Sequence, residues 1–519
     1  MSLFRSIATI GGWTMGSRLL GFVRDILMAS SLGAGMVADA FLVAFKFPNF
    51  FRRLFAEGAF NAAFVPLFGK ELEKDGIQVA RVFAADTAAL MVATLLTFTL
   101  LAIILMPILM FAIAPGFVDQ AEKFDLTVEL TRITFPYLTF MALIALMGGM
   151  LNTMQKFAAT AAAPILLNIV LILALVLLNF DVFKHPGFTL AWAVCAAGIG
   201  QFIWIAGACA KGGLLFRMRR PRFTPGIKRL LELMGPGLIG AGVVQINLVV
   251  DVILASTLQE GSVSFLYFAD RVTQLPLGVV GVAVGVALLP LLTRQIAEGD
   301  DRGAAESQNR AVEFALLLTV PAMLALLTIG DPVVRVLFER GAFDDVAAAN
   351  TAAALSAFAL GLPAYVLIKA LTPSFFARHD TVTPMKVAVT AMAVNIILAV
   401  IFMQIWAHVG IALATACSAW MNAILLWIIL HHRGQFYADS RLLRRGIRII
   451  AASIVMASIL FFTERQLGDY LMGSAAERAG SLIFLVALGL AIIGVFAPLF
   501  GAVKVSELKA MLRRPLVRD

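Results

Sequence analysis

Asp25-Ile-Leu-Met-Ala-Ser-Ser-Leu32 is the stretch that decides the fold, because Asp251-Val-Ile-Leu-Ala-Ser-Thr-Leu258 repeats it 226 residues later. Further residue pairs keep nearly the same spacing: Gly35 and Gly261, Pro66 and Pro290, Pro136 and Pro363, and Asn168 and Asn395. The spacing predicts two parallel copies of one unit, as expected when two lobes are related by an axis along the membrane normal.

The composition is that of a membrane protein. The chain has 519 residues, of which 61% are hydrophobic and 14% charged, and its mean hydropathy is +0.93. A soluble chain is nearer half apolar and a quarter charged. Apolar runs of about 18–25 residues recur from end to end, and each is long enough to cross ~30 Å of hydrocarbon. We therefore predict an all-α integral membrane protein with about fourteen transmembrane helices.

The predicted helices form three groups. Residues 1–225 and 226–435 are the two pseudo-symmetric lobes of six helices each, and residues 436–519 hold two additional helices and a cytoplasmic tail. The predicted spans are 7–30, 37–60, 82–113, 127–150, 158–180, 187–209, 230–256, 263–293, 310–330, 347–376, 384–405, 408–431, 447–464 and 480–502.

Basic residues set the expected orientation. Of the 41 Lys and Arg, 27 lie in the even-numbered loops and at the two termini, and 6 lie in the other loops. The positive-inside rule therefore places both termini of a multi-pass inner-membrane protein in the cytoplasm. Because most of the charge of +9 is a topology signal, we expect no nucleic acid partner.

Eight basic residues remain, and several lie well inside apolar runs. They are Arg18, Arg24, Lys46, Arg52, Arg53, Arg132, Arg271 and Lys369. Each costs about 2.5–3.5 kcal/mol at a lipid-facing helix centre, so such residues must face acids, water or a ligand. Five of the eight fall in the first two spans, where Asp25, Asp39 and Glu57 accompany them.

Helical spacing groups the charges of the first span. Arg18 and Asp25 are seven residues apart and share a face, and Gly21 between them leaves room for a ligand or another backbone. Ser17 and Arg24 have the same spacing on a neighbouring face. This pattern predicts a polar site along the first helix.

The second span carries a similar pattern. Asp39, Lys46 and Arg53 repeat every seven residues, and Glu57 stands four residues after Arg53. Pro48 is expected to break or kink this span and to free backbone groups, which is tolerated only where they meet protein or water. The alternative is that such charges are structural ion pairs only, as Arg53 with Glu57 or Arg132 with Glu129.

Arg18, Arg24, Arg52 and Arg271 together exceed the nearby acids, so a cavity of net positive charge is expected. The planar guanidinium group suits carboxylate or phosphate oxygens in a bidentate way. An anionic ligand is therefore predicted, and a diphosphate is a good match.

Asp251 is a lone carboxylate in a predicted span, which often marks a cation site. Asn395 and Thr415 are candidates to join it, since hard cations take oxygen ligands. The alternative, slightly favoured, is that Asp251 is a repeat relic of Asp25. No metal site or cofactor is expected beyond this candidate coupling to Na⁺, and the membrane potential is the rival driver.

Several motifs resemble one family over essentially the whole chain. They are SRLLGFVRD at 17–25, GAGMVADAF at 33–41, FKFPNFFRRLFAEGAF at 45–60, AFVP at 63–66, APGF at 114–117, TFPY at 134–137, GSVS at 261–264, YFADR at 267–271 and LLP at 288–290. With them the chain resembles the MurJ (MviN) family of lipid II flippases, within the multidrug/oligosaccharidyl-lipid/polysaccharide exporter superfamily.

The resemblance implies fourteen helices, with two extra helices forming a groove for a polyprenyl tail. It implies that the substrate is undecaprenyl-diphosphate disaccharide-pentapeptide (lipid II), moved to the periplasmic leaflet for peptidoglycan synthesis, cell-wall biogenesis and cell shape. The sensitive family positions correspond to Ser17, Arg18, Arg24, Asp25, Asp39, Arg52, Glu57 and Arg271, all present here.

The roles expected under alternating access divide these residues. Substrate binding is expected of Ser17, Arg18, Arg24, Arg52 and Arg271, and gating or charge pairing of Asp25, Asp39, Glu57 and Arg53. The alternatives are an exporter of another polyprenyl-linked saccharide or of drugs, and a non-transporting scaffold for cell-wall or division proteins. An enzyme is not expected, since no metal-ligand cluster, nucleophile elbow or phosphate-binding glycine loop occurs.

Overall fold

The computed structural model describes residues 3–53, 60–178, 180 and 185–503, with side chains from residue 11 onward apart from 236–241, 243–244 and 279–287. Across these ranges the chain is helical and contains no β-strand, which confirms the predicted fold class. Nine helical segments of this part are long and apolar enough to cross a membrane. The count of fourteen stays a prediction.

The helices group into two units, residues 1–264 with 340–344 and residues 265–339 with 345–519. The helices up to residue 256 are α1 Leu3–Leu32, α2 Met36–Phe51, α3 Phe60–Ile104, α4 Met106–Ile113, the 3₁₀ turn η2 Pro115–Phe117, α5 Ala121–Thr134, α6 Tyr137–Thr153, α7 Phe157–Leu178, α8 Pro186–Lys211 and α9 Pro225–Ser256. They are followed by α10 Ser262–Ala297, α11 Asp301–Phe338, α12 Asp345–Ala359, α13 Leu362–Phe376, α14 Val382–His432, α15 Ser440–Gln466, α16 Gly468–Leu471 and α17 Ala475–Leu499. Each unit is a set of residues that contact one another. The lobes, in contrast, are predicted from the sequence repeat, and their boundary at 225/226 stays a prediction.

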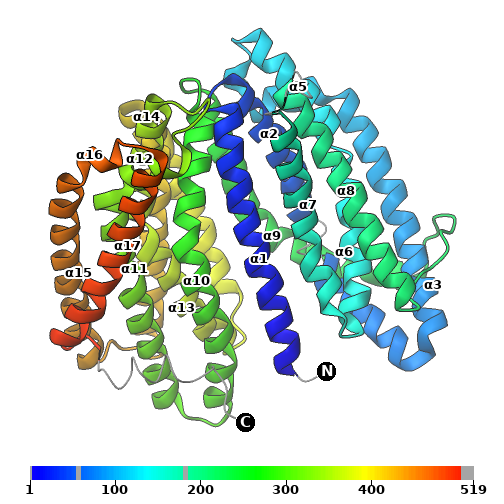
Figure 1. Ribbon diagram of the computed structural model, residues 1–519. Coiled ribbons are helices and arrows are strands. Elements are labelled where there is room, and N and C mark those ends of the chain that lie inside the picture. Colours follow the sequence, from blue (N-terminus) through cyan, green and yellow to red (C-terminus); the bar gives the residue numbers. More distant parts are fainter. Residues whose placement is uncertain (1–2, 54–59, 179, 181–184, 504–519) are drawn as a thin grey trace. The chain divides into compact units, whose positions relative to one another are not determined.

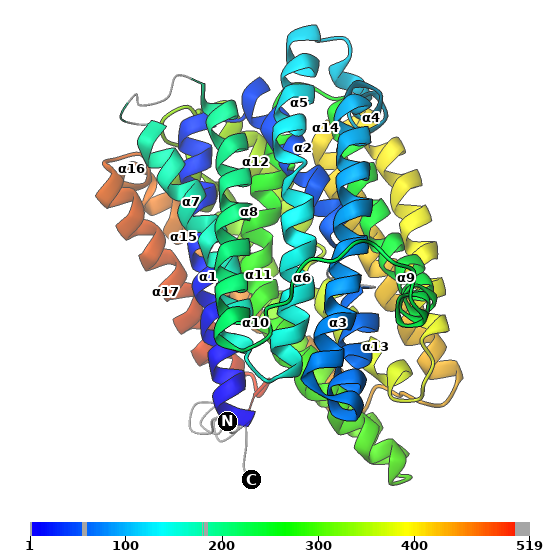
Figure 2. The same cartoon turned by 90° about the vertical axis from the view of Figure 1, so that its right-hand side faces the viewer.

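Each unit contains one broken helix that is more buried than the other apolar spans. In the first unit it is α5 with α6, whose most apolar window is 72% buried, and in the second it is α12 with α13, 67% buried. Figure 2 shows α5 leading into α6, with α3 and α8 beside α6. The first break includes Pro136 and the second lies just before Pro363, and these two prolines are paired in the sequence repeat.

Near each break, a backbone carbonyl accepts a hydrogen bond from a side chain of another helix. The carbonyl of Ile133 accepts a hydrogen bond from Cys195 Sγ at 2.8 Å, and the carbonyl of Leu360 accepts one from Trp420 Nε1 at 2.8 Å. Ile133 and Leu360 are 227 residues apart. Two repeat-related carbonyls near the breaks are therefore both hydrogen-bonded by a side chain of another helix.

Two long helices contain interruptions that separate predicted spans. In α3 the backbone leaves the helical region at Gly76, whose φ of 79° suits glycine. In α14 it does so at Trp406 and Ala407, between the predicted spans 384–405 and 408–431. The predicted turns therefore exist, although the helices on either side run nearly directly into one another.

The second span differs from its expectation at Pro48. The helix α2 is not broken there but runs on to Phe51, and a π-type turn follows at Arg52. Pro48 has no N–H to offer the carbonyl of Ala44, four residues earlier. Thr134 Oγ1 supplies the missing donor at 2.8 Å. The freed backbone group thus meets protein, as predicted, while the helix itself continues.

The last two long helices expose apolar side chains along their lengths. Figure 1 shows α15 and α17 side by side, next to α11. Only 28% of the most apolar window of α15 and 22% of that of α17 is buried. Exposed examples are Ile447, Ile454, Phe462, Ile483, Leu490 and Leu499. Such a surface is suited to lipid rather than water, so the chain is a multi-pass membrane protein.

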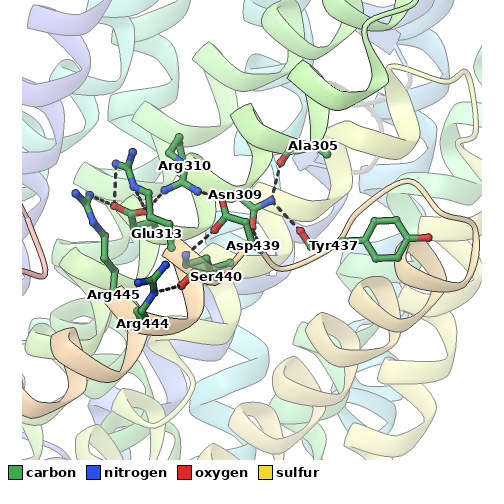
Figure 3. Close-up of polar contacts among 11 residues, drawn as sticks. Ala305, Asn309, Arg310, Glu313, Tyr437, Asp439, Ser440, Arg444 and Arg445 are labelled. Carbon is green, nitrogen blue, oxygen red and sulfur yellow. Dashed lines mark hydrogen bonds and ion pairs between the residues drawn. The ribbon is translucent and has the colours of Figure 1, made fainter.

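A charged network attaches α15 to α11 (Figure 3). The Glu313 carboxylate accepts hydrogen bonds from Arg310 and Arg445, and Arg441 Nε lies 3.3 Å from it. Asp439 accepts from Arg310 and caps α15 through the N–H of Leu442 at 2.6 Å. Glu313 and Arg445 are both buried. Paired charges thereby hold the start of α15 against α11 within the second unit.

Candidate functional site

Arg24 is the central buried cation of the predicted site. Its Nε and Nη2 atoms donate to Asp25 Oδ1 at 3.0 and 2.7 Å. The guanidinium carbon lies 5.8 Å from the centre of the Phe45 ring. Arg24 is 8% exposed and Asp25 1%. The cost of burying the guanidinium is thus offset by a charged acceptor and an aromatic face.

Asn168 of α7 completes the surroundings of Arg24. Its Oδ1 accepts from Arg24 Nη1 at 3.0 Å, and its Nδ2 donates to the carbonyl of Ser17 at 2.9 Å. A Cβ placed on Gly21 would lie 3.6 Å from the Asn168 amide. The room predicted beside Gly21 is therefore occupied by this side chain.

Asn168 was not among the predicted site residues, although its pairing with Asn395 in the repeat had singled it out. Spacing along one helix identifies neighbours on that helix, whereas Asn168 belongs to another. A polar residue that recurs in both copies was the available signal.

The other predicted residues of the first two spans differ in depth. Ser17 and Arg52 are half-buried, whereas Arg18 and Arg53 are exposed. Glu57 lies outside the described residues. The structure thus brings Ser17, Arg24 and Asp25 into one hydrogen-bonded group.

Asp39 forms a second group, and its cationic partner is not an arginine. Its Oδ2 accepts from Lys123 Nζ and from the N–H of Gly261, both at 2.8 Å. Its Oδ1 accepts from the N–H and the hydroxyl of Ser264 at 3.0 and 2.6 Å. The cationic partner of Asp39 is therefore Lys123, which lies in another helix.

The position of Lys123 is a correction. Lys123, one of the 6 basic residues expected in the other loops, lies within α5 and is 2% exposed, with its Nζ atom 4.2 Å from the centre of the Phe117 ring. The helix begins at Ala121, six residues before the predicted span. Polar neighbours made the segment resemble a loop, and only the fold brings Asp39 to it.

Asp39 also takes part in a reciprocal pair of helix caps. It binds backbone N–H groups at the start of α10, while Glu260, just before α10, accepts from the N–H of Met36 at the start of α2 at 2.7 Å. Gly35 and Gly261, which precede these helices, are repeat partners. A carboxylate at a helix N-terminus is favoured by the unpaired N–H groups there. The two repeat-related N-termini are thus held by each other's acids.

Arg271 belongs to the second unit. Its guanidinium carbon lies 4.7 Å from the centre of the Tyr267 ring, and Nη1 donates to Gln274 Oε1 at 3.5 Å. Gln274 in turn donates to Asp270. That Arg271 shares one cavity with Arg24 and Arg52 stays a prediction, since those residues belong to the first unit.

The residues of the candidate cation site likewise belong to different units. Asp251 lies in α9, and Asn395 and Thr415 lie in α14 of the second unit. Asn395 is buried and accepts from Ser418 Oγ at 3.4 Å, while the Thr415 hydroxyl donates to the carbonyl of Ile411 at 3.1 Å. Among the described residues no three His, Cys, Asp or Glu side chains are placed to hold a metal ion. The Na⁺ site stays a prediction.

Solved structures resemble this fold closely. One described as lipid II flippase MurJ in an inward closed conformation matches with a TM-score of 0.79 and 26% identity, over 97% of this chain and 99% of that one. An inward-facing multidrug resistance MATE family transporter of the MOP superfamily matches with a TM-score of 0.68 over 80% of this chain and 94% of that one. At 14% identity the second likeness shows the fold alone.

Sequence relatives cover the full length of the chain. The probable lipid II flippase MurJ of Rhizobium tropici is 45% identical over 521 residues, which is 99% of this chain and 97% of the relative. Lipid II flippase MurJ of Burkholderia cenocepacia is 33% identical over 89% of this chain and 90% of the relative. The family profile described as Lipid II flippase MurJ matches residues 28–480. This chain therefore belongs to the MurJ family of lipid II flippases.

Proposed function

We propose that this chain moves lipid II from the cytoplasmic to the periplasmic leaflet of the bacterial inner membrane by alternating access, and so supplies peptidoglycan synthesis. The observation that carries the proposal is the buried Arg24 guanidinium, held by Asp25 and Asn168 inside a membrane protein of the MurJ family. A guanidinium group can donate to phosphate oxygens and repels a cationic drug, which favours an anionic ligand.

In this proposal the arginines bind the head of the substrate. Arg24, Arg52 and Arg271 hold the diphosphate and the sugar-peptide head, with Arg18 and Ser17 in support. Guanidinium groups bind phosphate oxygens in pairs, which fixes the orientation of the head as well as its affinity. Asp25 keeps Arg24 in place between transport cycles.

Gating is assigned to the acids of the first lobe. The Asp39 network joins α2, α5 and the segment before α10 through four hydrogen bonds, and these must break if α2 and the start of α10 are to separate. A cluster that is satisfied only in one arrangement suits a two-state gate. Glu57 and Arg53 are proposed as a further gate pair.

The additional helices are assigned to the lipid tail. The exposed apolar side chains of α15 and α17 offer a surface along which a polyprenyl chain can lie while its head crosses between the lobes. Both termini are proposed to be cytoplasmic, with membrane lipids as neighbours and cell-wall or division proteins as partners. No catalysed reaction is part of the proposal.

Two drivers for transport remain open as predictions. One is Na⁺ bound at Asp251, Asn395 and Thr415, whose oxygen atoms suit a hard cation. The other is the membrane potential acting on the surplus arginines, which is worth about 2.3 kcal/mol per charge at 100 mV. The alternative functions stay an exporter of another polyprenyl-linked saccharide or of drugs, and a scaffold without transport.

The proposed function is tested in cells depleted of the native protein. Arg24→Ala and Arg52→Ala are expected to abolish movement of lipid II, measured as its distribution between leaflets, while the variants still insert in the membrane. Arg229→Ala is the control, because Arg229 is an exposed cation paired with Glu232. Normal lipid II distribution with both cavity variants would contradict the proposal.

A further inference from the structure

We infer that Asn168 is a positioning residue that sets the orientation of the Arg24 guanidinium toward an anionic headgroup. The inference rests on the proposed function, because it assigns Arg24 to the diphosphate of the substrate. It adds a residue of α7 to the group that Arg24 and Asp25 form on α1.

The geometry follows from the direction of side chains on α1. Helical side chains tilt toward the N-terminus of their helix, so Arg24 reaches back over Gly21. There Asn168 Oδ1 receives Nη1 at 3.0 Å, while Nδ2 donates to the Ser17 carbonyl at 2.9 Å. Asn168 thus binds two residues of α1 that are seven positions apart, because the Arg24 side chain reaches back toward Ser17.

These two bonds leave the guanidinium little freedom. Asp25 takes the Nε and Nη2 side of the group, and Asn168 takes Nη1 on the other side. A planar group held at all three nitrogens cannot rotate about its last torsion without losing a bond. The orientation of Arg24 is therefore fixed jointly by α1 and α7.

The chemistry explains why residue 168 is an amide. An amide accepts from Arg24 and donates to Ser17 at once, which an ionised carboxylate cannot do. It also adds no charge, so the group of Arg24, Asp25 and Asn168 stays neutral before the ligand arrives. A carboxylate at residue 168 would leave the group with one net negative charge and repel a diphosphate.

The close packing of α7 against α1 also supports the role of Asn168 in positioning Arg24. Small residues let helices approach closely in membranes, and α1 presents Gly16 beside Ile165 and Gly21 beside Asn168. Asn168 is 5% exposed. The amide is brought to Arg24 by a close helix contact and is not a mobile surface group.

The test is a double-mutant cycle on the purified full-length protein, with binding of lipid II as the measurement. Asn168→Leu keeps the size of the side chain and removes both bonds, and is expected to weaken lipid II binding about tenfold. In an Arg24→Ala background the same change is expected to have no further effect, because Asn168 acts through Arg24. A merely structural role would weaken binding equally in both backgrounds and would overturn the inference.

Asn168→Asp is the second variant, since it keeps an acceptor for Arg24 and disturbs the packing least. It is expected to fold and to bind lipid II more weakly than the unmodified protein, through its added charge. Binding equal to that of the unmodified protein would overturn the inference.

Gln201→Leu is the matched control. Gln201 is a buried amide of α8 in the same unit, donating to the Ala163 carbonyl at 2.8 Å, and its loss is expected to leave lipid II binding unchanged. A loss as large as that of Asn168→Leu would overturn the specific role of Asn168. Failure of the unmodified protein to bind lipid II would instead overturn the proposed function itself.

Discussion

A single carboxylate, Asp39, shows what a buried charge requires in this protein. Removing a carboxylate and an ammonium group from water costs several kcal/mol each, and their attraction offsets this only when further hydrogen bonds complete the site. Asp39 is 1% and Lys123 2% exposed. The carboxylate accepts from Lys123, Gly261 and Ser264, so both of its oxygens are used.

Lys123→Met is therefore expected to destabilise the protein by about 3–5 kcal/mol, because it leaves Asp39 buried without its counter-charge. Thermal unfolding of the purified protein measures the effect. Asp39→Asn combined with Lys123→Met is expected to recover part of the loss, since no buried charge then remains. A double variant less stable than Lys123→Met alone would contradict this account of the pair.

Residue-level prediction from sequence identified polar residues of the first helix but not their pairing. The spacing of seven placed Arg18 with Asp25 and Ser17 with Arg24, whereas the structure pairs Arg24 with Asp25 and leaves Arg18 exposed. Asn168 joins Arg24 to the Ser17 carbonyl. Lys123 and Asn168 were missed as partners because α5 and α7 bring them to the site only after packing. A spacing rule contains no information on that packing.

At the scale of helices, two side chains of α5 donate hydrogen bonds to backbone carbonyls that a proline leaves without a helical donor. Pro48 leaves the carbonyl of Ala44 without its helical donor, and Thr134 replaces it at 2.8 Å. Pro107 at the start of α4 leaves the carbonyl of Ile103 in the same state, and Arg132 Nε donates to it at 3.0 Å. An ion pair of Arg132 with Glu129 was one alternative from the sequence, and in the structure Arg132 donates to a backbone carbonyl.

Thr134→Val keeps the shape of the side chain and removes the donor to Ala44. It is expected to cost about 1–3 kcal/mol, the penalty for a buried acceptor without a partner. The measurement is thermal unfolding, repeated in a Pro48→Ala background, where the helix supplies its own N–H to the carbonyl. The cost of Thr134→Val should then be smaller, and an equal cost in both backgrounds would refute the assignment.

At the scale of the whole molecule, the repeat pairs Pro136 with Pro363, and in the structure each of these prolines lies beside a break in a buried helix. The repeat could not predict contacts that occur in only one of its two copies. Arg310, Arg441 and Arg445 were read as topology charges, yet they converge on Glu313. The number of arginines in a loop indicates on which side of the membrane the loop lies. Which acid each arginine pairs with depends on how α15 packs against α11. The attachment of the last helices therefore could not be predicted from the sequence, and the two-lobed plan stays a prediction.

That attachment leads to a prediction for Glu313. Arg445 is buried, whereas the side chains of Arg310 and Arg441 are 25% and 43% exposed and can reach water. Glu313→Leu leaves the Arg445 cation buried without its acid and is expected to cost about 3–5 kcal/mol. The segment 440–466 should then exchange its amide hydrogens faster, because α15 loses its anchor on α11.

The control is Glu298→Ala, which removes an exposed acid paired with Arg294 in the same unit. Exposed pairs contribute about 0–1 kcal/mol, so neither unfolding nor exchange should change appreciably. Replacing Glu313 and Arg445 together by leucine should restore much of the stability, since the remaining arginines are hydrated. If Glu313→Leu left exchange in α15 unchanged, the hydrophobic contacts of α15 with α11 would be sufficient to hold it, and the network would not be its anchor.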